Sequence, residues 1–378
     1  MKPLGLYIHI PFCRSKCLYC DFCSFPHQNE EKMTEYVGAL CRDLQSYAPL
    51  CRDYTVDTVF LGGGTPTTLP AHLLKELMGE IYKNYNVSPN TEITAECNPV
   101  TGERELFALM RAAGINRLSI GLQSVHEKEL KALGRLHTFD TFAACFADAR
   151  EAGFDNISID VMSGIPYQTP ESRLETLQKV ISLGPEHISS YDLIIEEGTP
   201  FFKKRDELPF PEEEDCRRMY LEGIGFLAEN GYAQYEISNF ARAGYESRHN
   251  RKYWNCDEYL GFGVAAHSDF GGERFGNSRD IEAYIAGRDI TEEREIPNKN
   301  ERINEYVMLR FRLCEGLYVS AFESRFGVSF EGMYGKKLAP FVKSGLVRRE
   351  GDRYFLTPEG MLVSNTILSE ILDFASQK

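Results

Sequence analysis

The feature that most constrains the fold is a repeated alternation of short apolar segments with longer amphipathic segments. Helical patterns separate the short segments, and several end in Gly after an apolar stripe, which is a normal helix C-cap signal. Six runs rich in β-branched and apolar residues are expected to be strands, at 5–10, 58–63, 91–97, 117–123, 157–164 and 187–194. Because continuously apolar strands that alternate with helices build parallel β/α units, we expect an α/β fold, either a doubly wound sheet or a complete or partial barrel.

The 378 residues are more than one small core needs, so a large domain followed by a smaller one is expected. A polar, charged segment at 288–301 is interpreted as a linker between a main domain of residues 1–287 and a C-terminal domain of residues 302–378. In the C-terminal part, helical segments precede a helix that runs into a β-hairpin. This order predicts a small α/β, winged-helix-like domain, which we expect to pack on the main domain rather than to bind DNA.

Charge and cysteine usage restrict the partners and the compartment. The net charge is −14, which disfavours nucleic acid as the main partner because phosphate binding needs clustered Lys and Arg. No window approaches about 18 consecutive apolar residues, and the N-terminal apolar run is too short and too polar for a signal peptide. We therefore expect no transmembrane segment and a cytoplasmic location, where the eleven cysteines stay reduced.

Four cysteines lie close together near the N-terminus. Cys13, Cys17 and Cys20 have the spacing C-x3-C-x2-C, and Cys23 follows three residues later. The preceding strand and proline favour a loop for this segment. Three thiolates on one loop can hold three irons of a four-iron cluster and leave the fourth iron open to a small ligand. If Cys23 also bound, the site would be closed, and a four-cysteine zinc site is the alternative.

Further polar residues and glycines follow the other expected strands. After the cysteines at strand one, these are GGGTPT (62–67) at strand two, then Glu96, Asn98, Gln123, Asp160, Tyr191 and Asp192 at strands three to six. Because chemistry in parallel β/α folds collects at the carboxyl ends of the strands, these residues are expected to outline one site. The three glycines would let the backbone approach a ligand closely, although the segment lacks the Lys of a phosphate-binding loop.

Taken together, these motifs resemble those of a known family. The matching segments span most of residues 7–270 and read YIHIPFC, CDF, FLGGGTPT, AECNP, RLSIGLQS, IDVMSGIPYQT and GFGVAAHS. They are similar to the radical S-adenosylmethionine (SAM) superfamily, in which CxxxCxxC binds a [4Fe–4S] cluster and SAM chelates its open iron. Within it, the chain resembles the oxygen-independent coproporphyrinogen III oxidase family and its HemW-type heme chaperone subgroup. The resemblance implies a partial (β/α)6 TIM-like barrel, open enough for a large substrate.

The resemblance also implies roles for individual residues. Cys13, Cys17 and Cys20 would hold the cluster, Tyr7 would pack near it, and Tyr19 would lie beside the SAM. The other positions that match SAM-binding or substrate-side residues of the family are Gly63, Gly64, Thr65, Pro66, Glu96, Gln123, Arg135, Asp160, Ile194 and His267. The implied chemistry is one-electron transfer from the reduced cluster to SAM, which is cleaved to methionine and a 5′-deoxyadenosyl radical. A flavodoxin or ferredoxin is an implied electron donor.

Two features discriminate within this family. The oxidase carries a fourth cysteine two residues after the third, at the position of Phe22 in this chain. The chaperone subgroup carries an HNxxYW motif, which matches HNRKYW (249–254) and contains the only Trp of the chain. Imidazole is a good axial ligand for heme iron, so His249 is a candidate heme ligand. A buried, hydrogen-bonded histidine is the structural alternative.

We therefore expect a heme chaperone that binds heme and delivers it to apo heme proteins. A radical SAM enzyme that acts on a porphyrin, such as the coproporphyrinogen oxidase, is the first alternative. A structural zinc protein is the second, disfavoured because zinc explains neither the glycine segment nor Glu96. Among the other histidines, His9 is expected to pack or hydrogen-bond near the cysteine loop. The rest are expected at the surface or at caps, namely His27, His72, His126, His137 and His187.

Overall fold

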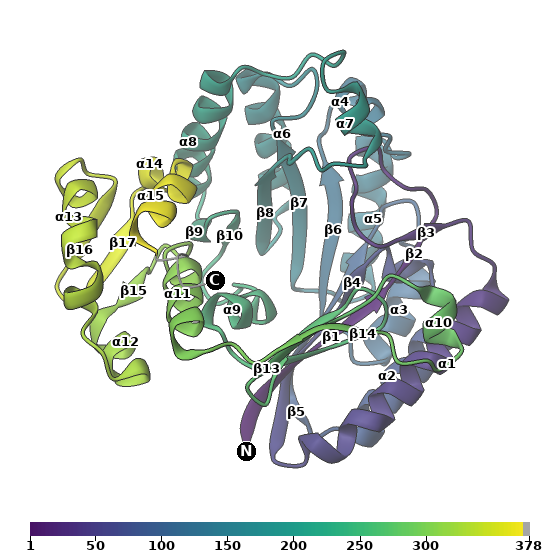
Figure 1. Cartoon of the computed structure of the whole chain (residues 1–378). Coiled ribbons are helices and arrows are strands. Elements are labelled where there is room, and N and C mark those ends of the chain that lie inside the picture. The colour runs from purple at the N-terminus through teal and green to yellow at the C-terminus, as the bar shows by residue number, and fades with distance from the viewer. Residues whose placement is uncertain (373–378) are drawn as a thin grey trace.

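The structure is a computed structural model and describes residues 1–372. Its main body is a curved sheet of twelve strands (Figure 1). The six parallel central strands are β1 (Lys2–Ile10), β4 (Tyr54–Gly63), β5 (Val87–Cys97), β6 (Arg117–Gln123), β7 (Ile157–Ser163) and β8 (His187–Asp192). The outer strands are β9 (Ala233–Glu236), β10 (Asn239–Ala241), β11 (Tyr259–Phe262), β12 (His267–Phe270), β13 (Glu273–Asn277) and β14 (Thr291–Glu295).

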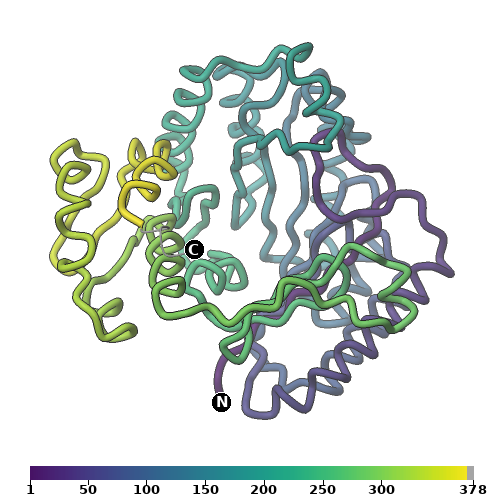
Figure 2. The backbone as a smooth tube through the Cα atoms, viewed as in Figure 1, coloured from purple at the N-terminus to yellow at the C-terminus, as the bar shows by residue number. Residues whose placement is uncertain are grey.

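The strand order is β14-β13-β12-β11-β1-β4-β5-β6-β7-β8-β10-β9. β11 pairs with β1 in parallel, so a late part of the chain returns beside the first strand, as Figure 2 shows where the green tube runs along the purple one. The two edge strands, β14 and β9, do not pair with each other among the described residues, and the barrel stays open. The predicted α/β fold, a partial barrel of six β/α units, is confirmed, and β11 adds a seventh parallel strand beside β1.

Alternate residues of the central strands face two different environments. In β6, Leu118, Ile120 and Leu122 belong to the apolar core under the helices, whereas Ser119 and Gln123 line a cavity. The strands are therefore buried on both sides, but their inner side is polar. The strands are buried as expected, but their inner residues are not apolar, because the inside of this open barrel holds a cavity rather than a packed core.

Helices cover the outer side of the sheet (Figure 1). They are α1 (Glu30–Tyr47), α2 (Ala71–Asn84), α3 (Arg104–Ala112), α4 (Glu127–Ala132), α5 (Phe139–Glu151), α6 (Pro170–Leu183), α8 (Glu213–Glu229) and α10 (Ile281–Ile285). The short α7 (Pro200–Lys204) lies at the end of the barrel, where the Phe201 N–H donates to the Leu18 carbonyl oxygen. The exception is α9 (Arg248–Asn255), which lies inside the curve of the sheet and contacts β4. Among the described residues, no helix is both long and apolar enough to cross a membrane.

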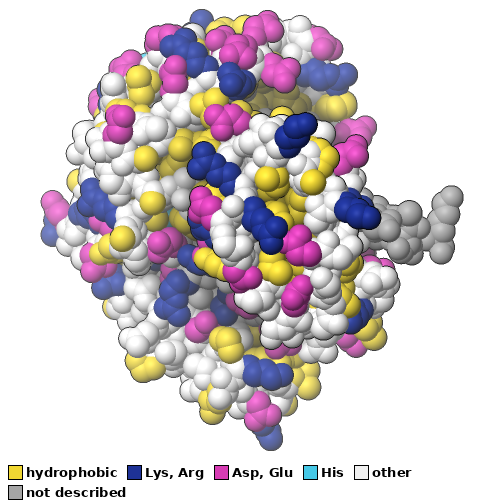
Figure 3. Space-filling model, turned by 90° about the vertical axis from the view of Figure 1, so that its left-hand side faces the viewer, with side chains coloured by type: hydrophobic (Ala, Val, Ile, Leu, Met, Phe, Trp, Pro, Cys, Tyr) yellow, Lys and Arg dark blue, Asp and Glu magenta, His cyan; other side chains and the backbone are white. Residues whose placement is uncertain are grey.

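The C-terminal part forms a second, smaller unit with its own core. Its helices are α11 (Lys299–Arg310), α12 (Val319–Phe326), α13 (Lys336–Lys343), α14 (Pro358–Leu362) and α15 (Ser364–Ile371), with a π-helical turn at Glu331–Gly335. Its three-stranded sheet has the order β15 (Leu317–Tyr318), β17 (Arg353–Leu356), β16 (Val347–Glu350). Helices followed by this β-hairpin confirm the winged-helix-like prediction. On the side of the molecule seen in Figure 3, Lys and Arg side chains are interspersed with Asp and Glu.

The predicted division at 288–301 remains a proposal, supported by two separate apolar cores. One core extends as far as Ile290, and the other begins at Ile303. The segment between them is not a free linker throughout, since β14 pairs with β13 and extends the main sheet. The last residues of the proposed C-terminal domain, 373–378, lie outside the described residues.

Candidate functional site

The cysteine loop leaves the carboxyl end of β1 and is anchored on both sides. Its ends are β2 (Phe12–Cys13) and β3 (Phe25–Pro26), which pair in parallel. In the middle of the loop, the Leu18 N–H donates to the carbonyl oxygen of Leu133 at 3.1 Å. This contact ties the loop to the segment that follows α4. The chain between the two short strands is thus held over the open end of the barrel, where the central strands end.

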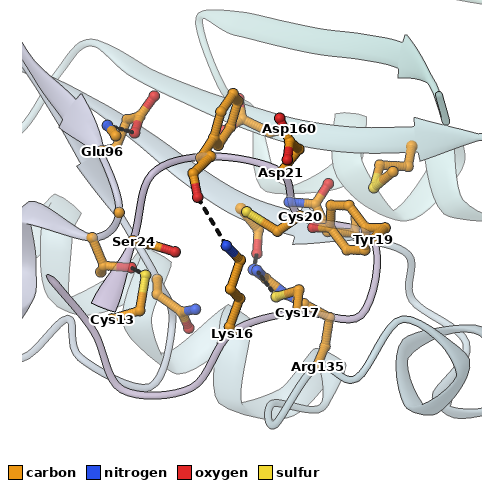
Figure 4. A pocket seen from close by; sticks show the side chains of 18 of the residues that line it. Cys13, Lys16, Cys17, Tyr19, Cys20, Asp21, Ser24, Glu96, Arg135 and Asp160 are labelled. Atoms are coloured by element: carbon orange, nitrogen blue, oxygen red, sulfur yellow. Dashed lines mark hydrogen bonds between the residues drawn. The ribbon is translucent and has the colours of Figure 1, made fainter. Parts of the chain in front are cut away.

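The side chains of Cys13, Cys17 and Cys20 border one cavity of about 410 Å³. Figure 4 shows the three thiols around this space, with Glu96 on the strands across from the loop. Cys23 has a different surrounding, because it is buried and borders a second cavity of about 310 Å³. The loop thus separates the three cysteines of the predicted ligand set from the fourth.

Burial affects the protonation of the cavity thiols. It raises the pKa of Cys13 above its ordinary value and that of Cys20 to about 11. These thiols are therefore protonated at neutral pH unless a bound metal withdraws charge from the sulfur. The Sγ of Cys13 lies 3.6 Å from Thr65 Oγ1, and Arg135 Nη1 donates to the Sγ of Cys17 at 3.5 Å.

No three His, Cys, Asp or Glu side chains within residues 1–372 converge closely enough to hold a single metal ion. A zinc knuckle needs four ligands about 2.3 Å from one centre, an arrangement these cysteines do not have. Three thiols spread around a cavity suit a larger group, such as an iron–sulfur cluster held by three cysteines. The donor set therefore fits a cluster better than it fits zinc.

The GGGTPT segment begins at the end of β4 and hydrogen-bonds to the start of the cysteine loop. The Gly64 N–H donates to the Ile10 carbonyl and the Thr65 N–H to the Phe12 carbonyl, both at 2.8 Å. Gly63 has a φ of +107°, and a Cβ placed there would lie 2.4 Å from the ring of His9. These glycines are therefore required by close backbone and side-chain packing next to the first cysteine, and Gly63, Gly64 and Thr65 also border the cavity.

Two carboxylates line the cavity from β5 and β7. The Glu96 Oε2 accepts from the Gly63 N–H at 3.0 Å, and Ser119 Oγ donates to Asp160 at 2.9 and 3.1 Å to its two oxygens. Burial, with the charge of Asp160 nearby, raises the pKa of Glu96 to about 7, and burial also raises the pKa of Asp160. The charge of a bound cationic group would offset the cost of burying these carboxylates, so the wall suits an ammonium or sulfonium ligand.

Gln123 is held in an uncommon backbone conformation at the end of β6. Its φ is +70°, although it is neither glycine nor in a turn that favours this region. The pairing with β7 shifts register between Gly121 and Gln123, and Tyr191 donates to Gln123 Oε1 at 3.0 Å. Strained backbone of this kind concentrates at binding sites, and here it turns a polar side chain toward the cavity.

The predicted site residues divide between two cavities. The larger one is bordered by Cys13, Cys17, Tyr19, Cys20, Gly63, Gly64, Thr65, Glu96, Gln123, Arg135, Asp160 and Ile194. Tyr7 and His267 border the smaller one, together with His9. Pro66 and His249 are not among the residues that border either cavity.

His9 connects the smaller cavity to the cysteine loop. Its Nδ1 lies 3.0 Å from the hydroxyl of Tyr7, and its Nε2 lies 2.8 Å from the carbonyl oxygen of Cys23. Burial lowers its pKa, so the ring is neutral and donates through one nitrogen while it accepts through the other. The expectation that His9 hydrogen-bonds near the cysteine loop is confirmed.

The HNRKYW segment forms α9 and is buried against the inner side of the sheet. His249 is 1% exposed, and its Nδ1 lies 2.9 Å from Thr58 Oγ1 while its Nε2 lies 2.8 Å from the Tyr253 hydroxyl. Its ring also stacks on Phe60. Burial, and then the charge of Lys252, lowers the pKa of His249 to about 3. In this arrangement both ring nitrogens already have partners.

Some cavity residues were missed by sequence reasoning. Ser119, Gly121 and Met162 line the larger cavity. Gly121 is two positions from Gln123, Met162 is two positions from Asp160, and Ser119 is four positions from Gln123. The period-two alternation of a strand would have found them once Gln123 and Asp160 were singled out.

The expected surface position of two histidines is wrong. His187 is fully buried, with Nδ1 2.8 Å from Ser158 Oγ and Nε2 2.9 Å from the Tyr235 hydroxyl. His137 is also buried, and its Nε2 lies 3.0 Å from the Leu122 carbonyl oxygen. Polarity suggested the surface, but the barrel interior is polar, and its hydrogen-bond partners come from distant parts of the chain.

Comparison with known proteins agrees with this geometry. Residues 7–180 match the model of the Radical SAM superfamily, and residues 298–363 match the HemN C-terminal domain. A solved structure of coproporphyrinogen III oxidase (HemN) from Escherichia coli, a radical SAM enzyme, superposes with a TM-score of 0.87 and 26% identity, over 99% of this chain and 91% of that one. The fold and the cysteine-lined cavity are thus those of the radical SAM class.

Relatives with higher sequence identity identify the subgroup of the family. The chain is 35% identical to the heme chaperone HemW of Bacillus subtilis (strain 168), over 97% of this chain and 98% of that protein. It is 33% identical to the heme chaperone HemW of Escherichia coli (strain K12), over 98% of this chain and 99% of that one. The chain belongs to the HemW-type heme chaperone subgroup of the coproporphyrinogen III oxidase family.

Proposed function

We propose that this protein is a heme chaperone that carries a [4Fe–4S] cluster, binds SAM and heme, and passes heme to apo heme proteins in the cytoplasm. The observation that carries the proposal is similarity to heme chaperones along essentially the whole chain. The presence of Phe22, where the oxidase has its fourth cysteine, favours the chaperone over the oxidase.

The ligands of the cluster in this proposal are Cys13, Cys17 and Cys20. Their support is the shared cavity, together with the burial of Cys23 against a different one. A cluster with three protein thiolates keeps one iron open, and when SAM is bound there the pair supplies one-electron reductive chemistry. A flavodoxin or ferredoxin would supply the electron.

The SAM in this proposal lies along the GGGTPT turn and the two carboxylates. Gly63 and Gly64 border the cavity, and Glu96 offers a carboxylate to the methionyl ammonium group. Arg135 and Asp160 complete the polar wall. Tyr7 and His267 border the smaller cavity, and their contact with SAM stays a prediction. These residues would bind and orient the molecule and exclude water around it.

His249 as an axial heme ligand remains a prediction, with a defined structural cost. Both ring nitrogens are hydrogen-bonded to Thr58 and Tyr253, and the ring is buried. Ligation of iron would therefore require α9 to move and two buried hydrogen bonds to break. The arrangement supports the alternative, in which His249 holds α9 on the sheet.

A heme titration of the purified, cluster-reconstituted protein tests the proposal. We expect a saturable Soret change that ends near one heme per chain, followed by transfer of that heme to an apo-cytochrome. The same titration on Cys17→Ala separates heme binding from cluster binding, because this variant lacks one predicted cluster ligand. The absence of saturable binding to the wild type would contradict the proposal.

The second candidate is an enzyme that acts on a porphyrinogen. It is favoured by the full-length superposition on coproporphyrinogen III oxidase. Anaerobic incubation with coproporphyrinogen III, SAM and a reductant distinguishes the two functions. We expect no decarboxylation under conditions in which an authentic oxidase is active, and turnover at the rate of that oxidase would favour the enzyme.

A further inference from the structure

Phe22 is an exposed aromatic residue in the second half of the cysteine loop, three residues before β3. Its side chain is 67% exposed, and it borders both the larger and the smaller cavity. Ile194, on the loop after β8, is 71% exposed and borders the larger cavity as well. Single exposed apolar side chains are common, but two that border one opening from separate loops form an unpartnered apolar rim.

Basic side chains lie beside Phe22. Lys16 Nζ donates to the carbonyl oxygen of Phe22 at 3.1 Å, and Arg279 pairs with Asp21 at 3.3 Å while it stays 64% exposed. On the other loop, Glu196 makes the surroundings of Ile194 acidic. In a chain with a net charge of −14, the two cations Lys16 and Arg279 outnumber the one carboxylate beside Phe22, Asp21, so this side of the rim is locally basic. A flat apolar ligand with anionic groups on one edge has complementary chemistry.

We propose that the porphyrin ring of heme binds at this rim, with its face against Phe22, its far edge toward Ile194, and its propionates toward Lys16 and Arg279. This inference rests on the proposed heme binding and gives it a location. Heme held there would be reachable by a recipient protein without any opening of the barrel. It would also leave the hydrogen bonds of His249 intact.

Two porphyrins separate contact with the ring from ligation of the iron. Heme and iron-free protoporphyrin IX are titrated into full-length, cluster-reconstituted wild type, Phe22→Ser and Leu50→Ser. Leu50 is a matched control because it is 62% exposed but lies before β4, at the opposite end of the strands. We expect Phe22→Ser to weaken both porphyrins by about tenfold, Phe22→Tyr to retain wild-type affinity, and Leu50→Ser to have no effect.

The charges are tested with the dimethyl ester of the porphyrin. Lys16→Gln combined with Arg279→Gln should weaken the binding of the free acid, with a smaller effect at high salt. The binding of the ester should be unchanged. Iron and sulfide content, measured for each variant, shows whether the cluster is retained. If Phe22→Ser loses the cluster, Ile194→Ser on the separate loop decides the question. Wild-type affinity of that variant for porphyrin would contradict binding at the rim.

The failure of this inference is distinguishable from the failure of the proposed function. Saturable wild-type binding that is unchanged in Phe22→Ser would overturn the rim and leave the chaperone proposal standing. Weaker binding of heme with unchanged binding of protoporphyrin IX would also contradict binding at the rim, because the substitution would then act through the iron. No binding of either porphyrin to the wild type would contradict the proposed function itself.

Discussion

The cysteine loop and the α9 helix differ in how their polar atoms are satisfied. The thiols of Cys13, Cys17 and Cys20 border a cavity and are partly exposed. His249 on α9 is 1% exposed, and each of its ring nitrogens has a hydrogen-bond partner. Both segments carry conspicuous residues in the sequence, yet the three thiols border a cavity and His249 borders neither cavity.

The hydrogen bonding of the polar atoms distinguishes a ligand site from a packing motif. A site for a metal cluster leaves donor atoms without sufficient protein partners, because the ligand completes them. A packing motif uses its polar atoms within the fold, where an unmade hydrogen bond costs free energy. By this criterion the cysteine loop is a ligand site, and α9 is a packing element that contacts both the sheet and the C-terminal unit.

The largest expected effect concerns the two kinds of cysteine in the loop. Cys17→Ala should abolish cluster assembly, because it removes one of three thiols around the larger cavity. Cys23→Ala should retain the cluster, because Cys23 borders the other cavity. Iron, sulfide and visible absorbance after anaerobic reconstitution measure both. Equal loss in the two variants would mean that the site is closed by four cysteines.

Replacement of His249 should mainly reduce stability. His249→Ala leaves the Thr58 and Tyr253 hydroxyls without their partners and opens a cavity, so we expect a loss of about 2–4 kcal/mol in the free energy of unfolding. Urea unfolding measures the loss, with exposed His72→Ala as the control. An unchanged unfolding free energy with an altered heme spectrum would instead make His249 an axial ligand.

The pH dependence of stability gives a second measure of the same residue. The pKa of His249 is about 3 in the fold, against an ordinary value near 6.5, so the unfolded chain binds this proton first. The contribution of neutral His249 to the free energy of unfolding is complete above pH 6.5. It is lost as the pH falls from 6.5 toward 3, by about 1.4 kcal/mol per pH unit at most. His249→Gln should reduce this slope by one proton, and an unchanged slope would contradict the burial of a neutral ring.

On the cavity side, Glu96→Gln should weaken SAM binding and stabilise the ligand-free protein. The pKa of Glu96 is raised to about 7, so the charged form is disfavoured in the fold and stability is lost as the pH rises from 4.5 to 7. Removal of the charge should add about 1–2 kcal/mol at pH 8. Calorimetric SAM titration and urea unfolding check the two parts. A variant that is less stable and binds SAM normally would show that Glu96 is structural.

The smallest expected effect is at the contact between the C-terminal unit and α9. Arg325 donates to the carbonyl oxygens of Asn255 at 3.1 Å and Cys256 at 3.0 Å, at the end of that helix. Arg325→Ala should cost about 0.5–1 kcal/mol and raise amide exchange in α9. The control is Arg353→Ala, which removes an exposed pair with Glu350. Equal exchange in both variants would mean that the contact does not hold the helix.

Much of the fold could be predicted because its signals are local. The six central strands are short runs of apolar and β-branched residues, and strands such as Arg117–Gln123 occur within a few residues of their expected ranges. The outer strands were missed, since segments such as Asn239–Ala241 are too short for a periodic pattern. β14 was missed because it lies in a charged segment that pairs only through its backbone with β13.

The sequence by itself determined the order of the β/α units and the spacing of Cys13, Cys17 and Cys20, because both depend on residues that are near in the chain. Tertiary structure decided which cavity each side chain borders. Cys23 lies three residues from Cys20 but borders another cavity, and His249 is buried because Thr58, almost two hundred positions earlier, is its partner. Periodicity reports that a residue is buried, whereas the direction of a loop side chain depends on the distant residues that pack against it.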